Sequence, residues 1–68
     1  MTITITINGE RRESREGLTV AELIADLELP PEHVAVELNQ ALLRRALFTE
    51  TTLRDGDVLE LVTLVGGG

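Results

Sequence analysis

Several residue types are missing from this 68-residue chain, and each absence excludes a kind of chemistry. Without cysteine there are no disulfides, no thiolate nucleophiles and no cysteine-based metal sites. Without lysine the chain offers no acceptor for an isopeptide bond. Phe48 is the sole aromatic residue, so Ile, Leu and Val must form the core. No apolar run approaches the roughly 20 residues of a membrane span, and we expect neither a signal peptide nor membrane association.

Net charge and chain length exclude further classes of function. The net charge is −6, which argues against nucleic-acid binding and favours either plain solubility or a basic partner. A single domain of this size has a small core, which would hardly support a deep catalytic cleft. The lack of disulfides fits a reducing compartment, so we expect a cytoplasmic protein.

The first fifteen residues predict a β-hairpin. Residues Thr2–Ile7 alternate threonine with isoleucine, as in a strand that buries one face. Asn8-Gly9 is a strong hairpin signal because both residues tolerate a positive φ. The second strand, Glu10–Arg15, is very polar and suits the edge of a sheet.

A helix is predicted from Val20 to Leu27. Thr19 and Glu22 have the spacing of a capping box, and Leu18 with Leu23 can form a hydrophobic staple around it. Apolar residues then recur at helical spacing and predict a stripe facing a core: Val20, Leu23, Ile24 and Leu27. Pro30-Pro31 prevents the helix from continuing.

The remaining sequence predicts short strands and one long final strand. We expect strands over Val34–Leu38 and Leu42–Arg44, then an irregular connection that carries core side chains. Asp55-Gly56-Asp57 predicts a tight turn before a strand over Val58–Val65. The order predicts an α+β fold with a mixed four- or five-stranded sheet and one main helix on one face. The first and last strands are the most apolar and should be adjacent at the sheet centre.

The chain ends in Val65-Gly66-Gly67-Gly68, which predicts a domain over residues 1–65 and a flexible tail over residues 66–68. A tail without side chains can enter a narrow channel, and three residues extend by at most about 10 Å. Its carboxyl group could then reach a buried active site in another protein. Because a carboxylate is a poor electrophile, it would need activation, and we expect adenylation with ATP.

The chain resembles the sulfur-carrier proteins of thiamin biosynthesis (the ThiS family) over nearly its full length. The matching stretches are Asn8-Gly9, residues 17–24, residues 34–39, residues 53–60 and the glycine tail. The resemblance implies a ubiquitin-like β-grasp fold and a thiocarboxylate at Gly68, with Gly67 as its narrow neck. It also implies three partners: a ThiF-type adenylyltransferase that uses ATP, a persulfide sulfur donor and thiazole synthase. The family usually ends in two glycines, so the working terminus is either Gly68 or, after trimming, Gly67.

A docking surface is expected beside the tail, because an activating enzyme must also bind the body of the protein. Val62 and Leu64 should point away from the helix, with Leu42 beside them. Exposed apolar side chains next to a reactive tail suggest a partner interface, although a loop or Phe48 could equally cover them. The acids Glu60, Asp57 and Glu50 would then attract a basic rim.

Other chemical sites have little support, and we expect no catalytic residue, metal site or bound cofactor. His33 is predicted to be a solvated loop residue, and Asp55 with Asp57 a turn, since calcium needs more oxygen ligands than these two acids supply. Ser14 has no histidine at a meaningful spacing. Three alternatives stay open: a molybdopterin-synthase sulfur carrier (MoaD-like), a β-grasp binding module of the TGS type, and a protein-conjugating modifier.

Overall fold

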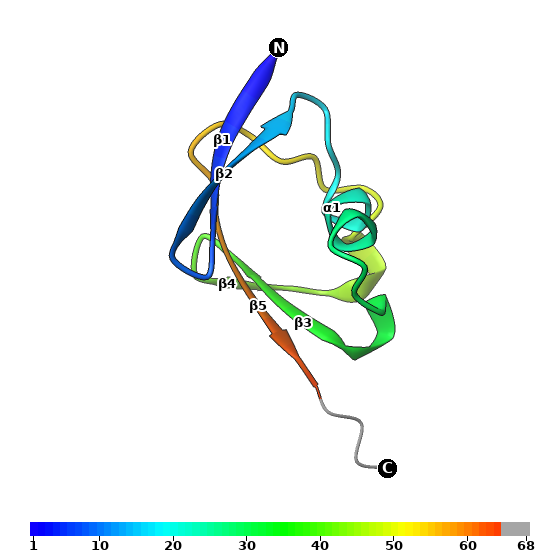
Figure 1. Ribbon diagram of the computed structural model, residues 1–68. Coiled ribbons are helices and arrows are strands. Elements are labelled where there is room, and N and C mark those ends of the chain that lie inside the picture. Colours follow the sequence, from blue (N-terminus) through cyan, green and yellow to red (C-terminus); the bar gives the residue numbers. More distant parts are fainter. Residues whose placement is uncertain (65–68) are drawn as a thin grey trace.

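In residues 1–64 five strands form one mixed sheet, and one α-helix packs across one of its faces (Figure 1). The computed structural model describes residues 1–64, so the predicted tail over residues 66–68 and Val65 lie outside the described residues. The elements are β1 (Thr2–Ile7), β2 (Glu10–Arg15), α1 (Val20–Asp26), β3 (Val34–Leu38), β4 (Ala41–Leu43) and β5 (Val58–Thr63). Two short 3₁₀ turns, η1 (Pro31–His33) and η2 (Arg45–Leu47), join them.

The strand order is β2-β1-β5-β3-β4, with β1 and β5 parallel and the other neighbours antiparallel. The predicted mixed sheet is therefore confirmed, as is the prediction that the first and last strands are adjacent. Parallel neighbours need a crossover connection, and here the chain between β1 and β5 contains β2, α1, β3 and β4.

The hairpin forms where the Asn8-Gly9 pair predicts it. Asn8 has φ 51° and Gly9 φ 86°, the left-handed backbone that a tight two-residue turn requires. This turn sets the register of β1 against β2, which pairs Thr2 with Arg15 and Ile7 with Glu10. The charged β2 lies at the sheet edge, as expected.

The capping box of α1 is present in both directions. The Glu22 N–H donates to Thr19 Oγ1 at 3.1 Å, and the Thr19 N–H donates to Glu22 Oε1 at 2.9 Å. The helix ends at Asp26, one residue earlier than predicted. The Glu28 and Leu29 N–H groups donate to the carbonyls of Ala25 and Ile24, so a Schellman motif closes the helix before the prolines.

Two strand boundaries differ from the prediction. β4 runs over Ala41–Leu43 rather than Leu42–Arg44, because Asn39 and Gln40 both have positive φ and form a turn that pairs Leu38 with Ala41 at once. β5 ends at Thr63, so the predicted end at Val65 was too late: Leu64 is no longer in the strand, although its N–H still donates to the His33 carbonyl at 2.6 Å.

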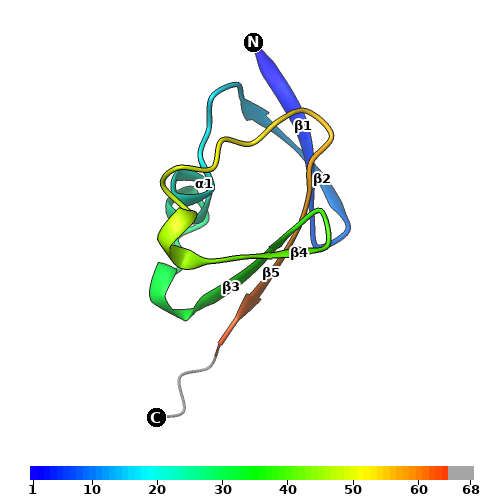
Figure 2. The same ribbon diagram turned by 180° about the vertical axis from the view of Figure 1, so that it is seen from behind.

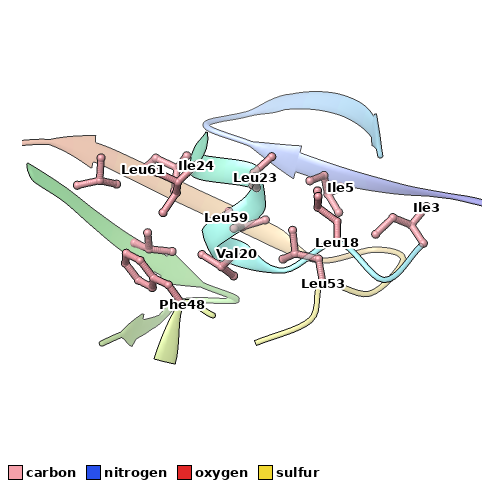
Figure 3. Close-up of a cluster of buried hydrophobic side chains, with 12 residues drawn as sticks. Ile3, Ile5, Leu18, Val20, Leu23, Ile24, Phe48, Leu53, Leu59 and Leu61 are labelled. Atoms are coloured by element: carbon pink, nitrogen blue, oxygen red, sulfur yellow. The ribbon is translucent and has the colours of Figure 1, made fainter. Parts of the chain in front are cut away.

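The core lies between α1 and the sheet (Figure 3). Val20, Leu23 and Ile24 of the helix are buried, as the predicted stripe requires. They pack with Ile3 and Ile5 of β1, Val34 and Val36 of β3, and Leu59 and Leu61 of β5, and with Leu18, Phe48 and Leu53 from the connections. Ile7 and Leu27 are only partly buried at the margin of this core. No helix within residues 1–64 is long and apolar enough to cross a membrane.

Candidate functional site

The open face of the sheet, meaning the face turned away from α1, carries the predicted docking residues. In Figures 1 and 2 both α1 and the connection around Phe48 lie on the other side of the sheet. Phe48 is buried in the core, so it does not cover the open face. The face assignment of β5 is confirmed: Leu59 and Leu61 are buried, whereas Val62 and Leu64 are more than half exposed.

The apolar side chains of the open face gather around β5. Val62 pairs with Ala35 of β3, and Val58 near the start of β5 is 47% exposed on the same face. Leu42 is 73% exposed, but it pairs with Glu37 rather than lying directly beside Val62. Because strands lie about 4.8 Å apart, Leu42 is roughly 10 Å from β5, with β3 between them. The apolar surface is therefore centred on β5, with Leu42 at its far margin.

Two carboxylates interrupt this apolar surface. Glu37 of β3 pairs directly with Glu60 of β5, and both side chains are exposed. Like charges at paired positions of a sheet repel each other. The ion pairs found within residues 1–64 involve Arg15 with Glu22 and with Asp26, so neither Glu37 nor Glu60 has an internal counter-ion there. The open face therefore presents two carboxylates, surrounded by apolar side chains, to which a basic partner protein could bind.

The end of β5 is held from both sides. On the β3 side, pairing continues to Thr63, and the Leu64 N–H bonds to the His33 carbonyl. On the other side β1 has already ended, and the Asn8 side chain takes its place, bonding both the N–H and the C=O of Leu61. These contacts fix the direction in which the chain leaves the sheet at Leu64.

The residues predicted to be structural have structural contacts. Asp55 Oδ1 accepts the Thr4 N–H at 2.8 Å. Asp57 accepts the Arg54 N–H with one oxygen and the Asn39 side-chain N–H with the other. Within residues 1–64 no three potential ligands come together to hold a metal ion. Of the acids predicted to attract a partner, Glu60 lies on the open face, whereas Asp57 is committed to its turn.

Gly66, Gly67 and Gly68, the predicted reactive tail, lie outside the described residues. The predicted docking residues did not include Val58, and the facing of Glu37 and Glu60 was not predicted. The alternation of β5 already placed Val58 on that face. The acidic pair depends on the register of β3 against β5, for which the sequence contains no signal.

Comparisons with known proteins agree with this geometry. Residues 5–68 match the model of the ThiS family. The chain belongs to the ThiS family. The sulfur carrier protein ThiS of Thermus thermophilus is 38% identical over 94% of this chain and 98% of that protein.

The fold is that of the same family. The crystal structure of the thiamine biosynthesis protein ThiS from Geobacter metallireducens is 39% identical, with a TM-score of 0.82 over 97% of this chain and 100% of that one. The resemblance to the ThiS family and the β-grasp fold are both confirmed. A thiazole synthase of Paramagnetospirillum magneticum is 36% identical over 94% of this chain, which spans only 20% of that protein.

Proposed function

We propose that this ThiS-family chain carries sulfur for thiazole formation in thiamin biosynthesis, with the carboxyl group of Gly68 as the carrier group. A ThiF-type adenylyltransferase joins the Gly68 carboxylate to AMP and releases pyrophosphate from ATP. The outer sulfur of a persulfide donor then attacks the acyl-adenylate and displaces AMP, which gives an acyl disulfide. A thiol cleaves the S–S bond of this acyl disulfide, forms a disulfide with the donor sulfur and releases the thiocarboxylate, which passes its sulfur to thiazole synthase. The observation that carries the proposal is the match of residues 5–68, glycines included, to the ThiS family.

The similarity to part of a thiazole synthase supports this pathway over the molybdopterin one. A domain of this kind within a thiazole synthase chain fits a carrier that hands its sulfur to that enzyme. The chain contributes the substrate group, and its partners supply the catalytic residues and the ATP. We place this chemistry in the cytoplasm.

The open face supports the docking step. Val62 lies near the end of β5 and Leu64 follows the strand, a few residues before the glycines, and both are more than half exposed. An extended glycine tail reaches at most about 10 Å beyond the body, so the activating enzyme has to contact this end of the sheet. We propose that it covers the apolar surface around β5 and places basic side chains against Glu37 and Glu60.

Exchange of labelled pyrophosphate into ATP tests the adenylation step. With the cognate adenylyltransferase, the full chain should support exchange, and a variant lacking Gly67 and Gly68 should not. Adding one residue after Gly68 should also abolish exchange, because the free carboxylate is the substrate. Circular dichroism of both variants should match that of the parent protein. Undiminished exchange by the deletion variant would overturn the proposal.

A further inference from the structure

The edge strand β2 has a neighbouring strand on one side only. Beyond its last residue the Glu16 N–H donates to the Met1 carbonyl at 3.0 Å, so the even-numbered residues of this segment bond towards β1. Because the direction alternates along an antiparallel strand, the odd-numbered residues turn their N–H and C=O groups to the open edge. These residues are Arg11, Glu13 and Arg15. Within residues 1–64 the Arg15 carbonyl accepts the Leu18 N–H at 3.3 Å, and a carbonyl oxygen can accept a second hydrogen bond.

The charges of residues 12–16 are arranged so that a second copy of the same segment complements them. We consider an antiparallel pair related by a two-fold axis that stands perpendicular to the sheet at Ser14. Glu13 then faces Arg15 of the second copy, and Arg12 faces Glu16 of the second copy. Symmetry repeats both contacts, so every charged residue of this segment faces an opposite charge. Facing residues of a sheet lie on the same side, so each of these charges can reach the other.

Neighbouring registers bring like charges together. An axis at Glu13 sets Glu13 against its own copy and Arg11 against Arg15 of the second copy. An axis at Arg12 sets Arg12 against its own copy. Like charges directly opposite each other destabilise a sheet, and charged edge strands usually prevent pairing for this reason. The charge pattern of β2 therefore favours the pairing centred on Ser14 and opposes the registers on that side of it.

This pairing lies far from the place where the chain leaves the sheet. Arg15 pairs with Thr2 at the start of β1. β5 pairs with the other end of β1, where Leu59 lies beside Ile7, and it continues beyond that end. In Figure 1 the end of β2 and the end of β5 accordingly lie at opposite ends of the sheet. Two paired copies would both keep the end of β5 and the open face accessible.

We propose that two copies of this chain pair through β2, with the two-fold axis at Ser14, and join their sheets into one. Arg15 also lies 3.9 Å from Glu22 and 3.7 Å from Asp26, but all three side chains are about half exposed or more, so Arg15 can exchange these contacts for Glu13 of the second copy. One pair of short strands buries far less than the roughly 1,200 Å² of a stable interface. The dimer is therefore weak, with a dissociation constant of about 0.1–1 mM.

Sedimentation equilibrium and amide hydrogen exchange of the full chain test this dimer, over concentrations from about 0.02 to about 2 mM that bracket the expected dissociation constant. The average mass should rise towards that of a dimer. The Glu13 and Arg15 amides should exchange more slowly as the concentration rises, because they become hydrogen-bonded across the axis. The Arg11 amide points to the same edge but lies outside the paired segment, so its exchange should not change.

Two charge reversals and their mixture test the register. Arg12→Glu and Glu16→Arg each turn the Arg12–Glu16 contacts into like-charge contacts, so each should weaken self-association about tenfold or more. An equimolar mixture of the two variants restores opposite charges at both contacts, and it should form a mixed dimer about as stable as the parent dimer. The matched controls, Arg45→Glu and Glu32→Arg, make the same charge changes at exposed positions outside β2 and should leave self-association unchanged.

Four results would overturn the proposal. They are a monomer at about 2 mM, well above the expected dissociation constant, slowed exchange on the open face in place of Glu13 and Arg15, no association in the mixture, and equal losses in the control variants. Slowed exchange on the open face would assign self-association to that face, and equal losses would assign it to net charge. The pairing uses residues 12–16 and not the Gly68 carboxyl group, so its failure leaves the proposed function standing.

Discussion

The side-chain amide of Asn8 hydrogen-bonds to both backbone groups of Leu61, 53 residues later in the chain. Asn8 Oδ1 accepts the Leu61 N–H at 2.8 Å, and Asn8 Nδ2 donates to the Leu61 carbonyl at 3.1 Å. One side chain thereby extends the β1–β5 ladder past the end of β1. The same residue has φ 51° and forms the hairpin turn. Asn8 therefore couples the turn to the strand that leads to the glycines.

Replacing Asn8 with aspartate should test this coupling. The substitution keeps the shape and the tolerance of positive φ, but it sets a carboxylate oxygen against the Leu61 carbonyl in place of a donor. We expect the free energy of unfolding at neutral pH to fall by about 1–2 kcal/mol. The loss of stability should be smaller at acidic pH, because the new carboxyl group becomes protonated there and can again donate a hydrogen bond to the Leu61 carbonyl. Urea unfolding at both pH values would measure it, and unchanged stability at neutral pH would contradict the account.

Glu28 offers a stabilising substitution. It has φ 60° at the position after the helix where glycine is usual, and a residue with a Cβ is strained there. Glu28→Gly should raise the free energy of unfolding by about 0.5–1 kcal/mol, less whatever entropy glycine adds to the unfolded chain. Glu28→Ala, which keeps the Cβ and removes only the charged group, is the control and should not stabilise. If both substitutions change the free energy of unfolding equally in thermal unfolding, the charge of Glu28, and not its backbone strain, would account for the gain in stability.

The pH dependence of stability should include a contribution from Glu22. The pKa of this carboxyl group is lowered from 4.5, first because it accepts the Thr19 N–H, and further by the Thr19 side chain and nearby Arg15. A carboxyl group with a lowered pKa in the folded state stabilises the fold above its ordinary pKa, and this is lost as the pH falls through the lower, folded-state value. Glu22→Gln should therefore destabilise the protein at neutral pH and progressively less below about pH 4.5. A difference in the free energy of unfolding between Glu22→Gln and the parent protein that stays constant down to pH 2 would refute a role for the charge.

Docking through the open face predicts an effect on affinity. Burying an aliphatic side chain contributes about 1.5–3 kcal/mol, so Val62→Asp should raise the KM for adenylation about tenfold or more without unfolding the domain. Leu64→Asp should act in the same way, and Leu42→Asp less, since Leu42 lies across β3. Thr4→Asp adds the same charge to an exposed position of β1 and should have little effect. Should Val62→Asp and Leu64→Asp both leave KM unchanged, the enzyme docks elsewhere.

Local sequence patterns were enough to predict most of this fold. The Thr–Ile alternation, the Asn8-Gly9 turn and the Thr19–Glu22 capping box act over a few residues, and each element that they predict is present. The errors are at element ends. Glu28 adopts a backbone usually taken by glycine, and the turn at Gln40 starts β4 one residue early. At Glu28 a left-handed residue other than glycine carried no signal, whereas the Asn39-Gln40 turn was recognisable and only the first residue of the next strand was misplaced.

The site was predictable only in part, because it depends on pairing between distant segments. The alternation of β5 was sufficient to place Val62 and Leu64 on the open face. The pairing of Glu37 with Glu60 follows from the register between β3 and β5. This register depends on residues far apart in the chain, so no short stretch of sequence predicts it.

Intact-protein mass spectrometry tests the central claim most directly. The chain should be produced together with its adenylyltransferase and sulfur donor, and then measured whole and by fragmentation. The account predicts a mass increase equal to replacing one oxygen by sulfur, located at the carboxyl group of Gly68, or of Gly67 if the last residue is trimmed. The Val62→Asp variant should carry less of it, and the deletion variant none. An unmodified terminus in protein from cells whose sulfur machinery is active would contradict the account.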